Sequence, residues 1–177
     1  NAKIDQARVN EMFDYAIEQG VNYFDTAWPY HGGESEIITA RLLEKYPRES
    51  YYIATKFPGF DTANMSKVEE IFEKQLEKCQ VDYFDFYLLH NVYENSIHTY
   101  LDPRWRIPEY FIEQKKKGRI KHLGFSTHGS VQMMEQFLDV CGADMEFCQI
   151  QLNYLDWTLQ DAKTKCEILQ RHNIPIW

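Results

Sequence analysis

Basic residues are in the minority in this 177-residue chain, which has 19 Lys and Arg against 27 Asp and Glu and a net charge of −8. Proteins that bind nucleic-acid phosphates or anionic membrane surfaces normally carry a basic excess, so we expect neither partner. No apolar run approaches the roughly 20 residues that a transmembrane helix needs. The hydrophobic content of 44% still allows a sizeable core. The composition therefore predicts a globular protein with neither a nucleic-acid nor a membrane partner.

Cysteine is scarce, and its spacing carries no motif. The four cysteines are Cys79, Cys141, Cys148 and Cys166, and none forms a C-x-x-C pair. This spacing does not fit a zinc site, and four cysteines are too few for a disulfide-built scaffold of this size. Each lies in a segment that has the pattern of a buried helix or strand, so we expect reduced thiols that fill the core. The sequence thus predicts a cytoplasmic enzyme without a metal site.

A glycine-rich phosphate-binding turn is also missing. Gly32-Gly33 is the only glycine pair, and the G-x-G-x-x-G pattern of open nucleotide-binding sheets does not occur. Helical and strand-like patterns alternate along the chain instead. Helical periodicity predicts helices over residues 5–19, 34–46, 66–79, 108–117, 130–140 and 160–172. Apolar β-prone runs predict strands over residues 21–25, 51–57, 83–90, 120–125 and 146–152, and the start of another at 174–177.

This alternation predicts parallel strands joined by right-handed crossovers. Two architectures satisfy it, the doubly wound sheet and the closed (β/α)8 barrel. Capping signals support the helix ends: Asp5 is suited to begin the first helix, and Gly20 is suited to its left-handed end. Ser66 and Glu69 form a capping box, which predicts that the third helix starts at Ser66.

Ionisable residues recur at the ends of three successive predicted strands. Asp25 ends the first, Lys56 lies near the end of the second, and His90 ends the third, at intervals of 31 and 34 residues. Each alone has a structural explanation, as a turn cap, a snorkelling lysine or a core histidine. Together they mark the C-terminal edge of a parallel sheet, where barrel enzymes build their active sites. Their placement favours the barrel.

The loop after the first strand adds Tyr30, whose phenol has an ordinary pKa of about 10. A buried Lys56 beside it is expected to lower that pKa, with Asp25 keeping the lysine charged, and His90 is expected to donate to the same substrate oxygen. The result is a general acid that faces a carbonyl. No nucleophile with a paired base appears, and a metal hydrolase built on Asp25 and His90 lacks further ligands at a suitable spacing. A hydride from a cofactor would complete the reaction.

Five ordered segments of the chain resemble the aldo-keto reductase superfamily, and look most like a bacterial branch of it. They are residues 20–27, 33–36, 53–56, 81–90 and 118–126. The resemblance implies a (β/α)8 barrel that reduces aldehydes and ketones with a nicotinamide cofactor, usually NADPH. It also implies a catalytic tetrad of Asp25, Tyr30, Lys56 and His90. We weigh this enzyme against a regulatory relative that binds the cofactor without useful turnover.

The resemblance also implies the cofactor and substrate contacts. Ser126, Thr127 and Gln149 would bind the nicotinamide carboxamide, with Asp25 at the same site, although Thr127 stands where Asn is usual in the family. Trp28 is the expected wall of the substrate pocket. The choice between NADPH and NADH and the oligomeric state stay open.

A complete barrel of this type needs about 250 residues. We therefore expect residues 1–177 to be one partial barrel domain that runs from helix 1 to the start of strand 7. The first strand would precede Asn1, and the eighth strand and the cofactor-phosphate loops would follow Trp177. Members of the bacterial branch often carry a C-terminal ferredoxin-like iron–sulfur segment. An iron–sulfur cluster would be possible only in such a segment beyond Trp177, because the chain has no cysteine cluster.

Overall fold

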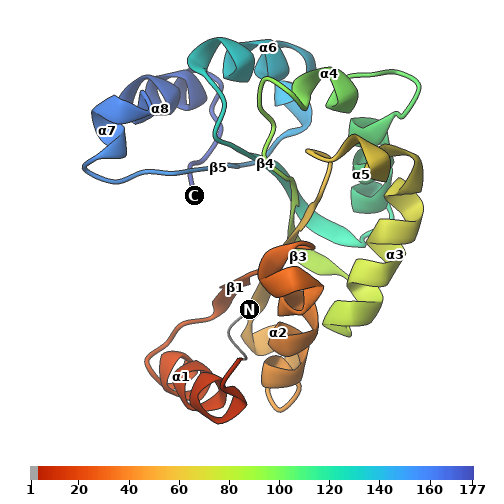
Figure 1. Ribbon diagram of the computed structural model, residues 1–177, viewed down its shortest axis with the longest axis vertical. Helices are drawn as coiled ribbons and strands as arrows, with labels where there is room; N and C mark the ends of the chain where they lie inside the picture. Colours follow the sequence, from red (N-terminus) through yellow and green to blue (C-terminus); the bar gives the residue numbers. More distant parts are fainter. Residues whose placement is uncertain (1–3) are drawn as a thin grey trace.

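A computed structural model describes residues 4–177 and contains one five-stranded parallel sheet in the order β1-β2-β3-β4-β5. The strands are β1 (Tyr23–Asp25), β2 (Tyr52–Phe57), β3 (Phe84–Leu89), β4 (Ile120–Thr127) and β5 (Cys148–Ile150). A single parallel bridge joins Cys148 to Ile176, where the next strand was predicted to start. The strands follow one another in sequence order, and the sheet curves into an open arc with its helices on the outside (Figure 1). This arrangement is that of a barrel, because a doubly wound sheet reverses its strand order and has helices on both faces.

The six predicted helices are present; four are two to four residues shorter than their sequence patterns, and the other two have the predicted length but are shifted by one residue. They are α1 (Gln6–Glu18), α2 (Ser35–Leu43), α3 (Val68–Cys79), α5 (Ile107–Lys116), α6 (Val131–Cys141) and α8 (Ala162–Arg171). Two one-turn helices, α4 (Ile97–Tyr100) and α7 (Asp156–Leu159), lie in loops and were not predicted. Short 3₁₀ turns cover Tyr30–Gly33, Arg48–Ser50, Thr62–Lys67 and Gly142–Asp144. No helix within residues 4–177 is long and apolar enough to cross a membrane.

The capping predictions had different outcomes. Asp5 accepts a hydrogen bond from the backbone N–H of Arg8 at 3.2 Å, and Gly20 follows the end of α1 with φ +91°, so both predictions are confirmed. The predicted start of the third helix at Ser66 is wrong. The Asp61 carboxylate accepts from the N–H of Ala63 at 3.0 Å and begins a 3₁₀ turn that contains Ser66. The α-helix begins only at Val68.

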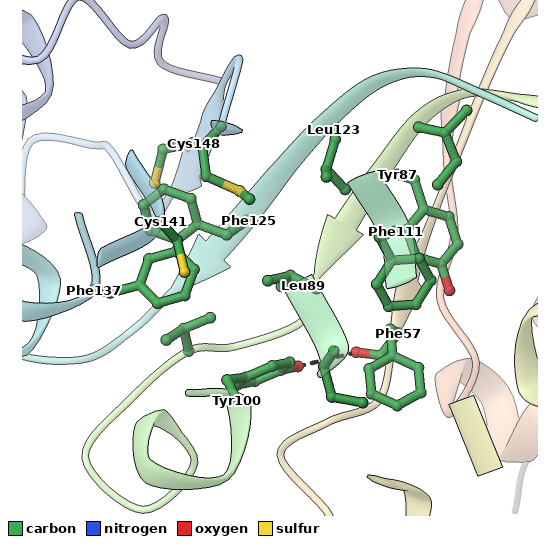
Figure 2. Close-up of a cluster of buried hydrophobic side chains, with 14 of the residues drawn as sticks. Phe57, Tyr87, Leu89, Tyr100, Phe111, Leu123, Phe125, Phe137, Cys141 and Cys148 are labelled. Atoms are coloured by element: carbon green, nitrogen blue, oxygen red, sulfur yellow. Dashed lines mark hydrogen bonds between the residues drawn. The ribbon is translucent and has the colours of Figure 1, made fainter. Parts of the chain in front are cut away.

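The main core lies between the sheet and the outer helices (Figure 2). Rings from neighbouring elements pack there at aromatic contact distances, with Tyr87 and Phe111 4.6 Å apart and Phe125 and Phe137 4.8 Å apart between centroids. All four cysteines are buried and free, which confirms their predicted role as core residues. Burial raises the pKa of the Cys141 thiol to about 11, so this thiol is protonated at neutral pH.

A second apolar layer lines the inner side of the arc. The centroid of the Trp177 ring lies 4.7 Å from that of Tyr23, 4.5 Å from that of Phe86 and 5.6 Å from that of Phe147. Gly124 on β4 is required here, because a Cβ atom at that position would lie 2.5 Å from the carbonyl oxygen of Phe147. Side chains therefore pack against one another on the inner side of the sheet, as in the packed interior of a barrel. Asp25 and Lys56 lie closer to the carboxyl ends of the strands than this apolar layer.

Candidate active site

The sheet register brings the three strand-end residues to one edge. Asp25, the last residue of β1, pairs with Ala54 of β2, and Lys56 pairs with Leu88 of β3. His90 immediately follows β3, and its N–H donates to the carbonyl of Phe57 at 3.1 Å. Because the strands are parallel, their carboxyl ends share this edge, as the sequence spacing predicted.

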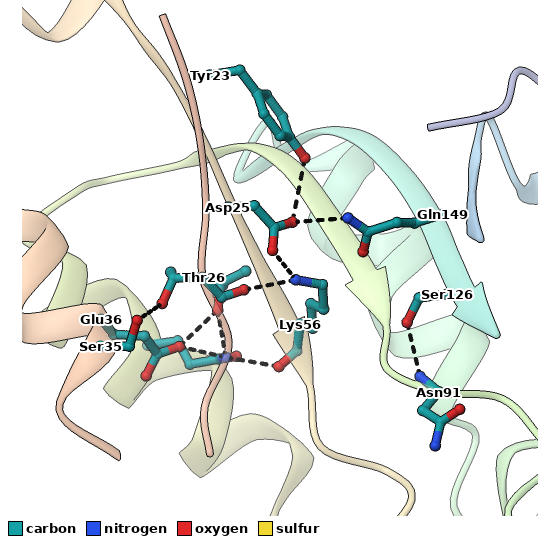
Figure 3. A network of polar contacts seen from close by, with 11 residues as sticks. Tyr23, Asp25, Thr26, Ser35, Glu36, Lys56, Asn91, Ser126 and Gln149 are labelled. Atoms are coloured by element: carbon teal, nitrogen blue, oxygen red, sulfur yellow. Dashed lines mark hydrogen bonds and ion pairs between the residues drawn. The ribbon is translucent and has the colours of Figure 1, made fainter. Parts of the chain in front are cut away.

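Lys56 and Asp25 form an ion pair at the centre of the cluster (Figure 3). The lysine side chain is only 1% exposed, and its Nζ donates to Asp25 Oδ1 and, at 3.0 Å, to the carbonyl of Thr26. Asp25 Oδ2 faces two further donors, the Tyr23 hydroxyl at 3.5 Å and Gln149 Nε2 at 3.4 Å. Burial lowers the pKa of Lys56, and Asp25 opposes that shift, since a nearby carboxylate favours the charged amine.

Tyr30 enters the cluster from the loop after β1. It begins a tight turn in which His31, Gly32 and Gly33 all have positive φ, a conformation that two glycines adopt without a Cβ clash. The Lys56 Nζ lies 5.0 Å from the centroid of the Tyr30 ring. The predicted cation therefore lies beside the Tyr30 ring. Tyr30 itself is 39% exposed, so its phenol is accessible to solvent.

The expected lowering of the Tyr30 pKa is wrong for this structure. Burial raises the pKa of Tyr30, and the Asp25 carboxylate raises it further. The larger physical reason is burial, which disfavours the charged phenolate, and the second is the Asp25 carboxylate. The carboxylate offsets the field of the lysine at the phenol, whereas the sequence argument counted the lysine alone.

His90 is held as a neutral imidazole. Its ring is edge-on to Tyr30 at 5.8 Å and to Phe60 at 5.2 Å between centroids. Burial lowers the pKa of His90 to about 3, and the charges of Lys56 and His128 act in the same direction. The buried Nδ1 atom has no hydrogen-bond partner within residues 4–177. A neutral ring keeps one N–H, so His90 can donate one hydrogen bond without carrying charge.

The ends of β4 and β5 complete a small cavity of about 220 Å³ beside the cluster. Ser126 pairs with Gln149 in the sheet register, and Thr127 pairs with Ile150. The cavity is lined by Tyr30, Lys56, His90, Ser126, Thr127, His128, Gln149, Ile150 and Gln151. The structure thus brings together every predicted catalytic and cofactor residue.

The polar groups of this cavity suit a primary carboxamide, with one exception. The Ser126 hydroxyl accepts from the N–H of Asn91 at 2.9 Å, and its own proton is not donated to any group in the described part of the chain. The Gln149 carbonyl oxygen likewise accepts no hydrogen bond from residues 4–177. One free donor and one free acceptor match the oxygen and the NH₂ of a carboxamide. Thr127 is different, because its hydroxyl donates to the Val92 carbonyl at 2.6 Å and so has no proton left to give.

Two residues near the cavity need separate mention. Trp28 does not line this cavity, but a neighbouring hollow that it shares with Pro58 and Phe60, and its ring lies 4.1 Å from the Nζ of Lys78. His128 lines the cavity and was not predicted. Its position directly after Ser126 and Thr127 at the end of β4 was the available signal. Residues 4–177 contain no group of three or more His, Cys, Asp or Glu side chains that could hold a metal ion.

Comparison with known proteins gives a consistent result. The profile of the aldo/keto reductase family matches residues 1–177. Probable aldo-keto reductase 1 of Glycine max is 32% identical over 126 residues, which are 65% of this chain and 34% of that protein. Aldo-keto reductase YhdN of Bacillus subtilis is 30% identical over 138 residues, 72% of this chain and 39% of that protein. The NADH-specific methylglyoxal reductase of Escherichia coli is 22% identical over 159 residues, 80% and 47% of the two chains.

The holo form of an aldo-keto reductase from Bacillus halodurans has the same fold, with a TM-score of 0.79 at 24% sequence identity. The match covers 98% of this chain and 57% of that one. The chain spans about a third to a half of the length of the curated relatives it matches. Its five-stranded arc is therefore an incomplete (β/α)8 barrel, and the chain belongs to the aldo/keto reductase family.

Proposed function

We propose that the protein reduces aldehydes or ketones to alcohols by hydride transfer from a nicotinamide cofactor, with Tyr30 as the proton donor. One observation carries the proposal. A phenol, a buried ammonium paired with a carboxylate, and a neutral imidazole converge at the C-terminal edge of the barrel sheet. This set can bind and protonate a carbonyl oxygen, and it provides no nucleophile of its own.

Each side chain of the tetrad has a distinct task in this mechanism. The raised pKa of Tyr30 keeps the phenol protonated at neutral pH, so the proton is present when the substrate binds. The ammonium of Lys56 stabilises the phenolate as the proton leaves, since a buried charge acts strongly over about 5 Å. Asp25 holds that ammonium in place. His90 donates its remaining N–H to the carbonyl oxygen and fixes the substrate's orientation.

Ser126 and Gln149 would hold the nicotinamide through its carboxamide. The hydroxyl proton of Ser126 suits the carboxamide oxygen, and the Gln149 carbonyl suits its NH₂. When bound, the cofactor supplies the hydride. Thr127 supports this site through the backbone, because its hydroxyl joins the Val92 carbonyl to the N–H of Gly129. We propose NADPH or NADH as the donor.

The test is substrate-dependent oxidation of the reduced cofactor by the protein expressed from its complete reading frame. Two relatives are named as methylglyoxal reductases, so methylglyoxal is a suitable first substrate, followed by a panel of aromatic and aliphatic aldehydes. We expect oxidation of NADPH or NADH that depends on the aldehyde and yields the alcohol. Cofactor binding without turnover on any member of the panel would contradict the proposal and favour the regulatory alternative.

A further inference from the structure

One fully buried carboxylate lies behind the catalytic edge, on the side of β2 away from the cavity. It belongs to Glu36 in the first turn of α2, six residues after Tyr30 (Figure 3). Its Oε1 accepts from the Thr55 hydroxyl at 2.7 Å and from Gln75 Nε2 at 2.8 Å. Its Oε2 accepts from Lys78 Nζ at 3.3 Å. The two oxygens therefore point to two different parts of the site.

The Oε1 branch leads to the strand that carries Lys56. Gln75 Nε2, which contacts Glu36, also donates to the backbone carbonyl of Lys56 at 3.0 Å. The side-chain oxygen of Gln75 accepts from the hydroxyl of Tyr87 on β3 at 2.5 Å. Glu36, Gln75 and Tyr87 are all completely buried, so little movement is available to this branch. It fixes the backbone from which Lys56 projects.

The Oε2 branch leads to the loop that carries Tyr30. Lys78 Nζ donates to the carbonyl of Gly33 at 3.0 Å and lies 4.1 Å from the centroid of the Trp28 ring. Trp28 and Gly33 flank Tyr30 in the tight turn after β1. Lys78 thus contacts residues on both sides of Tyr30, and the Glu36 carboxylate accepts a hydrogen bond from Lys78. One carboxylate connects the position of the phenol to the position of the lysine.

Packing alone does not require this arrangement. Burial of an ionised carboxylate costs several kcal/mol before its partners compensate, and apolar residues of similar volume often stabilise a fold as well or better. Glu36 contacts none of the residues that line the active-site cavity through its carboxylate. We propose that Glu36 is a positioning residue for the reaction, which sets the Tyr30–Lys56 separation by joining the Tyr30 turn to β2. The inference rests on the proposed function.

The chain offers a matched control at the other end of the sheet. Asp85 on β3 is also a buried carboxylate, and it accepts from Arg48 at 2.6 Å and from the N–H of Ile53 at 2.9 Å. Asp85 and its partner Ile53 each lie second in their strands, at the opposite end from Lys56 and His90. Asp85→Asn therefore removes a buried charge without touching either branch of the Glu36 network.

Two variants separate positioning from stability. Glu36→Gln keeps an acceptor for Thr55 and Gln75 but turns an NH₂ group toward Lys78, so it breaks the branch to the Tyr30 turn. Glu36→Gln combined with Lys78→Met removes the remaining donor–donor conflict, yet leaves the Gly33 carbonyl without its donor. The double variant no longer places two donors against each other, so we expect it to be more stable to heat than the single variant, although the Gly33 carbonyl has lost its donor. Both variants lose the connection between Glu36 and the Tyr30 turn, through Lys78 in the single variant and through Lys78 and Gly33 in the double variant.

The measurements are kcat at saturating cofactor and substrate, cofactor affinity by fluorescence, melting temperature, and hydrogen exchange over residues 26–34. All use the protein expressed from its complete reading frame. We expect kcat to fall by about 10- to 100-fold in both Glu36 variants, the scale of a small misplacement of reacting groups, with cofactor affinity unchanged. Exchange over the Tyr30 turn should become faster. Asp85→Asn should lower the melting temperature while kcat of the folded protein stays the same.

Unchanged kcat in the folded double variant would overturn the inference, as would an equal loss of kcat in Asp85→Asn. If the unmutated protein reduces no carbonyl compound, the proposed function fails instead. Hydrogen exchange then decides the inference by itself. Faster exchange confined to residues 26–34 in both Glu36 variants would support the connection, and unchanged exchange there would refute it.

Discussion

The neutral state of His90 leads to a quantitative prediction about acid stability. Burial first, and then Lys56, lowers the pKa of this imidazole from 6.5 to about 3 in the folded protein. The unfolded chain keeps the ordinary value and therefore binds the proton more tightly. Below pH 6.5 the unfolded state gains a proton that the folded state refuses, so the stability that neutral His90 permits is lost as the pH falls toward 3.

The magnitude follows from the two pKa values. Each pH unit below the unfolded pKa costs up to about 1.4 kcal/mol, so at about pH 5 the loss is about 2 kcal/mol relative to neutral pH. A His90→Gln variant lacks this titration. The free energy of unfolding by urea, measured for both proteins at about pH 5 and about pH 7.5, should therefore decrease by about 2 kcal/mol more in the unmutated protein than in the variant.

A proton NMR titration of the imidazole signal checks the cause directly. The signal that is missing in His90→Gln should show no titration near pH 6.5, the ordinary value for histidine. Equal pH dependence of unfolding in the two proteins, or an imidazole that titrates near 6.5, would refute the argument. Either result would mean that the folded protein does not hold His90 neutral at pH values below 6.5.

Four further substitutions have definite expected outcomes. Lys56→Met removes the cation 5.0 Å from the Tyr30 ring, so the limb of the kcat/KM pH profile that reports the phenol should move to higher pH; an unmoved limb would make the lysine structural. Gly124→Ala places a Cβ atom 2.5 Å from the Phe147 carbonyl, and urea unfolding should show a loss of about 1–3 kcal/mol, whereas an unchanged midpoint would contradict the close packing. Ser126→Ala removes the free hydroxyl proton and should weaken cofactor binding in a fluorescence titration, while Thr127→Val should weaken it less, and the reverse order would contradict the assignment.

The arrangement of the catalytic edge could be predicted because it depends on repeat length alone. Intervals of 31 and 34 residues place Asp25, Lys56 and His90 one β-α unit apart, and parallel register then brings them to one height. Local signals were equally readable where a single residue decides the outcome, as with the Asp5 cap. The start of α3 was not, because Asp61 begins an earlier turn that includes Ser66.

The electrostatics of the site could not be predicted from the sequence. The net shift of the Tyr30 pKa depends on how deeply the phenol is buried and on how close the Asp25 carboxylate lies, which residue order does not show. Thr127 was expected at the carboxamide site, but its hydroxyl donates to the Val92 carbonyl and accepts from the N–H of Gly129. The contact of the Trp28 ring with Lys78 was also not visible in the sequence. The Tyr30 pKa, the Thr127 hydrogen bonds and the Trp28 contact all depend on residues from other segments of the chain.

The replacement Tyr30→Phe tests the central claim most directly, because it removes one hydroxyl and leaves the ring contacts with Lys56 and His90 in place. The measurement is the rate of aldehyde reduction under saturating reduced cofactor, made alongside a cofactor titration by fluorescence on the same preparation. With Tyr30 as the general acid, reduction falls by about 100-fold or more while cofactor affinity is retained. A Tyr30→Phe protein that binds the cofactor normally and reduces the aldehyde within a few-fold of the unmutated rate would contradict the account.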